Sequence, residues 1–417
     1  MNQILDVFFH EVLCGQLIQN KSGQLSFRYH KSYREKNDSS PISVLFPLQE
    51  PSYEGDKVKA YFSGLLPDDI VRHRLAEYLG LSEKNPFSLL EAIGGECAGA
   101  LTFYPEGESP SSPLPEDIEI LDDYKLKEIL DLLKKRPLMA GSDGIRLSLA
   151  GAQDKIAVGI KGNDVTLIKG TTPTTHILKP LLDTVKDSVH NEFFCMRLAE
   201  LSKIKTSSVF IRWLDDTPYF LTERYDRIRN NSGNILRLHQ EDFCQALGIM
   251  PEMKYEREGG PSVPQCLKLI QDYSLHPATD QLAFIERLIF NYLIGNADAH
   301  GKNHSFLYKN KMPILAPAYD LLCTALYPNL SPKMAMKVGK TYDPEFILLR
   351  YWNQIVPTTK MAQKNLKKMA LTLSKESLDK AYELKSILAI EGIKSPIFED
   401  ICQIIKKRSE SLRSIFI

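Results

Sequence analysis

Hydrophobic and polar positions alternate in short runs along the first hundred residues. The apolar runs over residues 3–9 and 12–18 predict one β-hairpin, and those over 23–29 and 42–48 predict a second. Helical spacing of apolar residues then predicts a helix over Ile70–Leu79. The N-terminal part of the chain is therefore expected to be a mixed β/α domain.

Two irregular segments follow. Gly94–Ala100 is rich in glycine, but it lacks the spacing of a phosphate-binding loop and precedes an apolar strand over Leu101–Tyr104, so a tight turn is favoured. Pro105–Asp117 holds four prolines and only one large apolar residue. Because proline removes backbone donors, this segment is expected to be a linker or long surface loop, with an insertion inside one domain as the alternative.

Beyond this segment, strands come first and helices later. Apolar residues from Leu126 to Leu133 recur at helical spacing, and a strand-loop-strand pattern runs from Arg146 to Ile160. Helical patterns dominate from Glu241 onward. The elements expected in between are strands at Thr166–Ile168, Thr175–Lys179, Ser208–Leu214 and Pro218–Glu223, and a helix at Ser188–Leu201. This order predicts an α+β fold with two lobes after the N-terminal domain.

Composition narrows the class of protein. The chain has 417 residues, with 52 Lys and Arg against 52 Asp and Glu, which excludes a strongly basic nucleic-acid binder but allows a local basic patch. The seven cysteines are odd in number and form no CxxC pair, which favours a reducing, cytoplasmic location over a disulfide framework. We expect no signal peptide, because a basic start is missing and the first lysine is Lys21. We expect no membrane span, because no apolar run approaches the roughly 20 residues required.

The strongest chemical signal is the segment Asn291–Asn303. An apolar helix breaks at Gly295 into a loop that is dense in polar residues. Asp298 precedes Asn303 by five positions, which is the spacing of a kinase catalytic loop, where the Asp positions the attacking hydroxyl and the Asn holds magnesium. His300, two positions after the Asp, is typical of phosphoinositide-type kinases.

Asp320 is the candidate for a second magnesium ligand, at the end of a short extended run. Magnesium prefers oxygen ligands, so Asp320 and Asn303 suit it chemically. The alternative is that Asp320 caps a helix beginning at Leu321.

Other segments supply the remaining parts of a nucleotide site. Lys179 ends an apolar strand and is a candidate phosphate contact, with Glu192 as a possible partner; a surface lysine before a proline is the alternative. The small-residue loop Ser148–Lys155 lets backbone N–H groups approach phosphate, although any β-turn can look similar. The charged strand end near Glu223 is a candidate adenine contact, or else a solvated strand end.

Taken together, these motifs resemble the HipA family of serine/threonine protein kinases, the toxins of bacterial toxin–antitoxin modules. The matching segments are YFSGLLPDD at 61–69, GGECAGAL at 94–101, SLAGAQDK at 148–155, THILKP at 175–180, NEFFCMRLA at 191–199, TERYDR at 222–227, QEDFCQALG at 240–248, IGNADAHGKN at 294–303 and YDLL at 319–322. The resemblance implies an N-terminal mixed β/α domain and a two-lobed, phosphoinositide-kinase-like core with a helical C-terminal lobe. The implied boundaries are 1–105 for the N-terminal domain, 106–122 for a linker, 123–240 for the N-lobe and 241–417 for the C-lobe.

The resemblance also implies roles for individual residues. Asp298 is the implied catalytic base, Asn303 and Asp320 the magnesium ligands, Lys179 a phosphate contact, and Ser148 an autophosphorylated serine whose modification switches the kinase off. The further implied ATP contacts are Ala150, Gly151, Ala152, Gln153, Lys155, Glu223, Tyr225, Gln240 and His300.

The implied cofactors are ATP and Mg²⁺, and the implied partners are a helix-turn-helix antitoxin of the HipB type and a protein substrate, expected to be an aminoacyl-tRNA synthetase. Operator DNA is expected to be bound mainly through the antitoxin. The basic C-terminal end, Lys406–Arg413, is expected to be a solvated helix face.

Two rival functions remain at this stage. One is a metal-dependent hydrolase that uses Asp298, His300, His304 and Asp320, although Gly301 argues against a regular helix there. The other is a catalytically silent corepressor that acts with a DNA-binding antitoxin.

Overall fold

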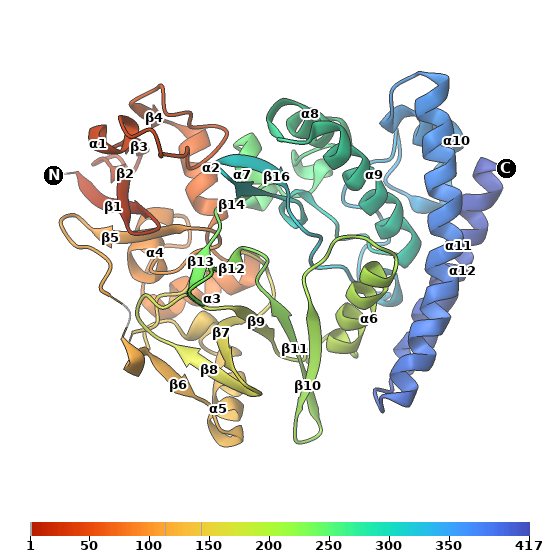
Figure 1. Cartoon of the computed structure of the whole chain (residues 1–417), viewed down its shortest axis with the longest axis horizontal. Helices are drawn as coiled ribbons and strands as arrows, with labels where there is room; N and C mark the ends of the chain where they lie inside the picture. Colours follow the sequence, from red (N-terminus) through yellow and green to blue (C-terminus); the bar gives the residue numbers. More distant parts are fainter. Residues whose placement is uncertain (1, 113, 143) are drawn as a thin grey trace. The chain divides into compact units, whose positions relative to one another are not determined.

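The computed structural model describes residues 2–112, 114–142 and 144–417, and the chain divides into two compact units (Figure 1). The first unit comprises Met1–Pro180, Leu221–Lys254 and Ser305–Pro313. The second comprises Leu181–Phe220, Tyr255–His304 and Ile314–Ile417. No helix in the described part of the chain combines the length and the apolar character that crossing a bilayer requires.

The first unit begins with a five-stranded antiparallel sheet in the order β4-β3-β2-β1-β5 (Figure 1). Its strands are β1 (Gln3–Phe9), β2 (Val12–Gln19), β3 (Leu25–Tyr29), β4 (Ser52–Glu54) and β5 (Leu101–Pro105). Gln3 pairs with Gln19 and Phe9 with Val12, which confirms the first predicted hairpin.

The second predicted hairpin is wrong, because residues 42–48 form no strand. Side chains rather than a neighbouring strand satisfy this segment's backbone. The Tyr29 hydroxyl accepts from the N–H of Ile42 at 2.9 Å and donates to the carbonyl of Phe46 at 2.7 Å, and the Tyr61 hydroxyl donates to the carbonyl of Ile42 at 2.6 Å. The strand that pairs with β3 on this side is β4.

Four helices complete the N-terminal part of this unit. They are α1 (Lys31–Arg34), α2 (Asp56–Gly64), α3 (Asp69–Leu79) and α4 (Pro86–Ile93). Phe62 of α2 contacts Phe27 of β3 and Phe103 of β5, at ring-centroid distances of 5.6 and 5.8 Å. Aromatic side chains thus bind the helical layer to the sheet.

A second sheet has six strands in the order β10-β11-β9-β7-β8-β6, with β10 at Val209–Leu214, and its strands β9, β7, β8 and β6 lie wholly in the first unit. The other strands are β6 (Ile118–Ile120), β7 (Ile156–Lys161), β8 (Asp164–Ile168), β9 (His176–Lys179) and β11 (Thr217–Glu223), and the helix α5 (Asp123–Leu133) follows β6. The predicted helix and strands are therefore confirmed, except that Leu147 makes only an isolated bridge with Glu96.

Smaller strands end the first unit. They are β12 (Arg227–Arg229), β13 (Ile235–Arg237), β14 (Gln240–Asp242), β15 (Ser305–Lys309) and β16 (Met312–Leu315), with the helix α7 (Phe243–Leu247). β14, β15 and β16 form a three-stranded sheet. Helices do dominate after Glu241, as predicted, but these short strands were not predicted from the sequence.

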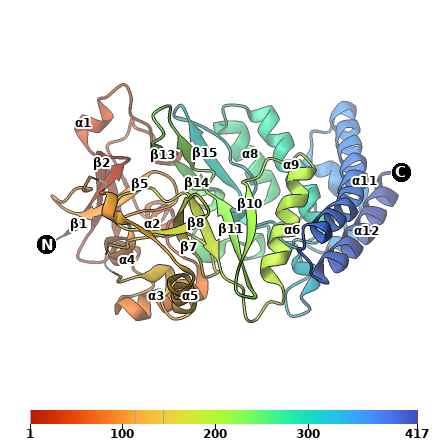
Figure 2. The ribbon, with the colours of Figure 1, turned by 60° about the horizontal axis from the view of Figure 1, so that its bottom comes forward.

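The second unit is mainly helical. Its helices are α6 (Ser188–Leu201), α8 (Val263–Tyr273), α9 (Pro277–Ile294), α10 (Leu349–Trp352), α11 (Lys360–Ile390) and α12 (Ile397–Phe416), and the strand β10 (Val209–Leu214) pairs with β11. α11 and α12 lie side by side in both views (Figures 1 and 2). Phe194 of α6 stacks on Phe398 of α12, with ring centroids 4.9 Å apart, inside a buried apolar core.

Candidate active site

The loop that carries Asp298 begins where α9 ends. Gly295 terminates the helix with a φ of +72°, a left-handed conformation that favours glycine. The Thr324 hydroxyl then accepts from the N–H of Ala297 at 2.7 Å and donates to the carbonyl of Gly295 at 3.2 Å. The break at Gly295 is confirmed, and a distant threonine fixes the direction in which the loop leaves the helix.

Hydrogen bonds hold Asp298 at both its backbone and its side chain. Its N–H donates to Oδ1 of Asn296 at 3.0 Å, and its carbonyl accepts from Nδ2 of Asn303 at 2.9 Å and from the N–H of His300 at 2.8 Å. Its Oδ1 accepts from the Tyr255 hydroxyl. The five-residue spacing therefore has a structural meaning, since Asn303 closes the loop back onto Asp298.

Asp320 follows an extended stretch and has a φ of +53°, in the left-handed region. Such backbone strain in a residue other than glycine is typical of functional sites. The predicted alternative, a helix cap, is wrong, because no helix begins at Leu321; the next helical turn is the 3₁₀ segment Thr324–Leu326.

Asn191 of α6 fixes the backbone just after Asp320. Its Oδ1 accepts from the N–H of Cys323 at 2.7 Å, and its Nδ2 donates to the carbonyl of Cys323 at 3.0 Å and to the Tyr327 hydroxyl at 2.9 Å. Its side chain is fully buried, so these bonds lie away from water, where they are strongest.

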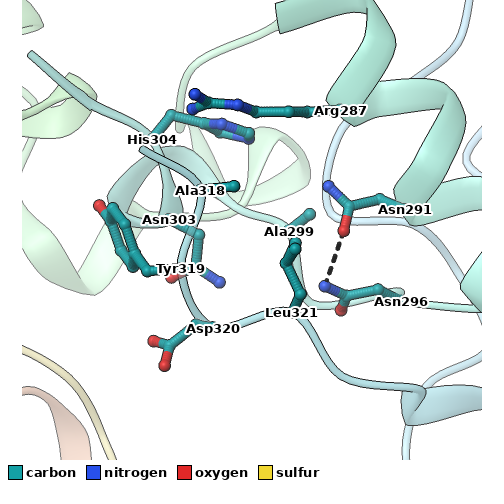
Figure 3. A pocket seen from close by; sticks show the side chains of 10 residues that line it. All are labelled: Arg287, Asn291, Asn296, Ala299, Asn303, His304, Ala318, Tyr319, Asp320 and Leu321. Atoms are coloured by element: carbon teal, nitrogen blue, oxygen red, sulfur yellow. Dashed lines mark hydrogen bonds between the residues drawn. The ribbon is translucent and has the colours of Figure 1, made fainter. Parts of the chain in front are cut away.

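Asn303 and Asp320 line one small pocket of the second unit (Figure 3). The other residues that line it are Arg287, Asn291, Asn296, Ala299, His304, Ala318, Tyr319 and Leu321. Because Nδ2 of Asn303 binds the Asp298 carbonyl, the Asn303 side chain presents its oxygen as the atom for a metal ligand. With the carboxylate of Asp320, these residues provide oxygen donors that fit Mg²⁺.

His304, the histidine that lines the pocket, packs against an aromatic ring, and burial favours its neutral form. The His304 ring packs edge-on against Phe284 at 4.9 Å, and burial, followed by the Arg287 charge, lowers the pKa of His304 to about 3. Within the described residues, no three His, Cys, Asp or Glu side chains come together closely enough to hold a metal ion. Gly301–Asn303 is a short 3₁₀ turn, so His300 and His304 do not share a regular α-helix.

The Ser148–Lys155 loop lies in the first unit and is held by the segment around α3. The buried Ser148 hydroxyl donates to the carbonyl of Leu65 at 2.7 Å, and the N–H of Asp68 donates to the carbonyl of Gly151 at 3.1 Å. Arg74 forms an ion pair with Asp154 at 2.5 Å.

Within this loop, Lys155 Nζ donates to the carbonyl of Ala150 at 2.6 Å, which closes the turn. Gly151, Ala152 and Gln153 lie between them, and Gly151 has a φ of +116°. The small residues predicted for a phosphate loop thus form one tight turn.

The other predicted nucleotide contacts also belong to the first unit. Lys179 is buried at the end of β9, so the alternative prediction of a surface lysine is wrong. Glu223 is exposed at the end of β11, and the partly buried Tyr225 donates from its hydroxyl to Oε1 of Gln240. Glu192 belongs to the second unit, so its pairing with Lys179 stays a prediction.

Three residues support the site although the sequence assigned them no individual role: Tyr255, Asn191 and Asn296, the last of which was already counted among the polar residues of the loop. Asn191 lies inside the motif NEFFCMRLA and Asn296 inside IGNADAHGKN. Their position in these motifs could have indicated that they belong to the site. Tyr255 lies in no motif, and only the fold brings it to Asp298.

Comparison with known proteins places these features in a family. The family described as the HipA N-terminal domain matches residues 5–104, and the family described as the HipA-like C-terminal domain matches residues 147–381. The putative kinase Y4mE of Sinorhizobium fredii is 42% identical over 341 residues, which are 81% of each chain.

Two further matches, one of sequence and one of structure, come from Shewanella oneidensis. The serine/threonine-protein kinase toxin HipA is 30% identical over 358 residues, 82% of this chain and 80% of the relative. A solved structure of HipA with HipB and its operator DNA contains a chain that matches with a TM-score of 0.82 and 25% identity, covering 99% of this chain and 96% of that chain.

Proposed function

Since the chain belongs to the HipA family and is by homology a serine/threonine protein kinase, we propose that it transfers phosphate from ATP, with Mg²⁺, to a protein and acts as a toxin. The observation that supports this most is the pocket that Asn303 and Asp320 both line, together with the bond from Asn303 to the Asp298 carbonyl. The kinase toxin HipA among the relatives supports the toxin role.

In this proposal Asp298 orients the acceptor hydroxyl and takes its proton as the oxygen attacks the γ-phosphorus of ATP and ADP leaves. Asn303 and Asp320 would hold magnesium, which would supply positive charge that neutralises the phosphates. Lys179 and Lys155 contact the phosphates under the Ser148–Lys155 loop. Glu223 and Tyr225 contact adenine, Gln240 reaches the ribose, and His300 shapes the catalytic loop.

We further propose that Ser148 is autophosphorylated and that this switches the kinase off. Ser148 is fully buried and its hydroxyl donates to the carbonyl of Leu65. The hydroxyl can therefore receive a phosphate only after the loop leaves this position. A phosphate adds roughly two negative charges to the side chain. Phosphoserine cannot return to this buried position, because the carbonyl oxygen there is itself partly negative and cannot donate a hydrogen bond to it.

The proposed partner is a helix-turn-helix antitoxin that carries most of the operator binding, and the proposed substrate is an aminoacyl-tRNA synthetase in the cytoplasm. The support for the partner is the likeness to the HipA chain solved with HipB and operator DNA. The balanced charge of this chain agrees with DNA binding through a partner.

Labelling with γ-phosphate-labelled ATP and Mg²⁺ tests the kinase proposal. We expect the purified protein to label Ser148, and Asp298→Ala to reduce the rate by a factor on the order of 10²–10⁴, since general-base catalysis is lost. Asp379→Ala, at an exposed position of α11, is the matched control and should keep the wild-type rate. No label on the wild-type protein would overturn the proposal.

Expression in cells tests the toxin role. The wild-type protein should arrest growth and Asp298→Ala should not, and a comparison of the two phosphoproteomes should identify the substrate. Equal growth arrest by both proteins would favour the corepressor function instead.

A further inference from the structure

Tyr255 contacts Asp298 from a distant part of the second unit. Its hydroxyl donates to Oδ1 of Asp298 across 43 residues of sequence. Its ring packs edge-on against the His300 ring, with centroids 5.1 Å apart and an interplanar angle of 90°. Tyr255 therefore contacts two members of the same loop, one by a hydrogen bond and one by its ring.

The backbone around Tyr255 is anchored, so its hydroxyl has a defined position. The Tyr255 carbonyl accepts from the N–H groups of Glu258 and Gly260, both at 2.9 Å, which closes a tight turn. The next residue, Glu256, donates from its N–H to the carbonyl of Ala335 at 3.1 Å, and its carboxylate accepts from the N–H of Lys337 at 2.6 Å.

A base in phosphoryl transfer must present one carboxylate oxygen to the acceptor in a fixed direction, because small misplacements lower the rate steeply. The backbone bonds of Asp298 fix its Cα, whereas the direction of its two oxygens depends on bonds made to the carboxylate itself, of which the bond from Tyr255 is one. A donor on Oδ1 restricts rotation of the carboxylate and so sets the direction of the second oxygen.

We propose that Tyr255 is a positioning residue for Asp298, which orients the carboxylate for the acceptor hydroxyl through its own hydroxyl. This inference rests on the proposed kinase function. It concerns the turnover step rather than ATP binding, since Tyr255 acts through Asp298 and not on the nucleotide.

Tyr255→Phe tests the inference, because it removes the hydroxyl and keeps the ring that contacts His300. We expect kcat, here the rate constant of the single Ser148 autophosphorylation event at saturating ATP, to fall about tenfold, which is the value of one hydrogen bond to a charged group. The KM for ATP should stay within about twofold, as expected for an interaction that matters only in the transition state. Tyr273→Phe, at an exposed position of α8, is the matched control and should keep the wild-type kcat.

A second measurement separates positioning from a general effect on folding. The melting temperature of Tyr255→Phe should equal that of Tyr273→Phe, and adding Tyr255→Phe to Asp298→Ala should not lower the residual rate further. Unchanged kcat, a faster rate, or a lower melting temperature with a raised KM would each overturn the inference while leaving the kinase proposal standing. Absence of phosphate transfer by the wild-type protein would instead overturn the kinase proposal.

Discussion

Glu96 lies at the centre of a buried ion-pair network in the first unit. Its carboxylate accepts from Arg227 at 2.7 Å, from Arg224 at 3.3 Å and from the Thr174 hydroxyl at 2.9 Å. Burial alone would raise its pKa, but the charges of Arg237, Arg227 and Arg224 lower it to about 2. The network joins the glycine segment at 94–100 to the strand end next to Glu223 and Tyr225.

Replacing Glu96 by Gln should destabilise the protein, because it leaves the two buried guanidinium groups of Arg224 and Arg227 with the carboxylate of Asp226 as the negative charge that both still contact. Breaking a buried pair costs about 3–5 kcal/mol, which corresponds to a fall in melting temperature on the order of 5–10 °C. Calorimetry against Glu108→Gln, an exposed glutamate, checks this. Equal melting temperatures for the two variants would contradict the role assigned to Glu96.

The sequence could not predict this network. The motif GGECAGAL suggested a turn, and the turn is present, but nothing in it indicates that the carboxylate meets arginines about 130 residues later. The same holds for Asp298, since its loop was predictable from the spacing to Asn303, whereas its contact with Tyr255 depends on the fold.

Among the elements, those with a clear hydrophobic period were predicted best. α6 has the predicted bounds, Ser188–Leu201, and α3 begins one residue before the predicted helix. The strand predicted at 42–48 is wrong, because the hydrophobic pattern does not reveal what the backbone bonds to. Here tyrosine hydroxyls, rather than a neighbouring strand, form the hydrogen bonds to the backbone. β15 and β16 were missed because they are short and follow a long helical stretch.

The C-terminus of α9 gives a prediction at this scale. Gly295 has a φ of +72°, and a Cβ there would lie 2.9 Å from Cβ of Ala325 and 3.0 Å from a methyl carbon of Ile404. Gly295→Ala should therefore displace the loop that carries Asp298 and lower both the melting temperature and the rate of autophosphorylation.

Gly392→Ala is the matched control, since Gly392 has a φ of +81° but no atom within 4 Å of an added Cβ. Both variants carry the same kind of backbone strain, on the order of 1–2 kcal/mol, so the excess effect at Gly295 measures the packing. If Gly392→Ala lost as much activity as Gly295→Ala, packing against the loop would not be the cause.

At the scale of the whole molecule, segments far apart in the sequence belong to one compact unit. Glu241 of β14 joins the irregular segment after α1 to β15. It accepts from the Ser43 hydroxyl at 2.6 Å, from the N–H of Val44 at 3.0 Å and from the Tyr308 hydroxyl. Burial raises its pKa from 4.5 to about 7, against the effect of these donors.

The raised pKa of Glu241 predicts a pH dependence of stability. Between about pH 4.5 and 7 the folded protein keeps a proton on Glu241 that the unfolded chain releases, so the free energy of unfolding decreases as the pH rises through this window. Glu241→Gln cannot titrate. The melting temperature of the wild type should therefore fall by a few °C relative to Glu241→Gln between pH 5 and pH 8. Parallel melting curves across this range would show that Glu241 does not titrate there.

The seven cysteines, all free and buried, have a practical consequence. Burial raises the thiol pKa, to about 12 for Cys97 and Cys323, so the reactive thiolate is scarce in the native protein. Alkylation therefore reports local opening rather than surface accessibility. Cys14, Cys97 and Cys244 belong to the first unit, and Cys195, Cys266, Cys323 and Cys402 to the second. The alkylation rate of each cysteine in the unmodified chain therefore measures how often its own part of the fold opens. Cys323, three residues after Asp320, reports the opening of the segment that follows Asp320.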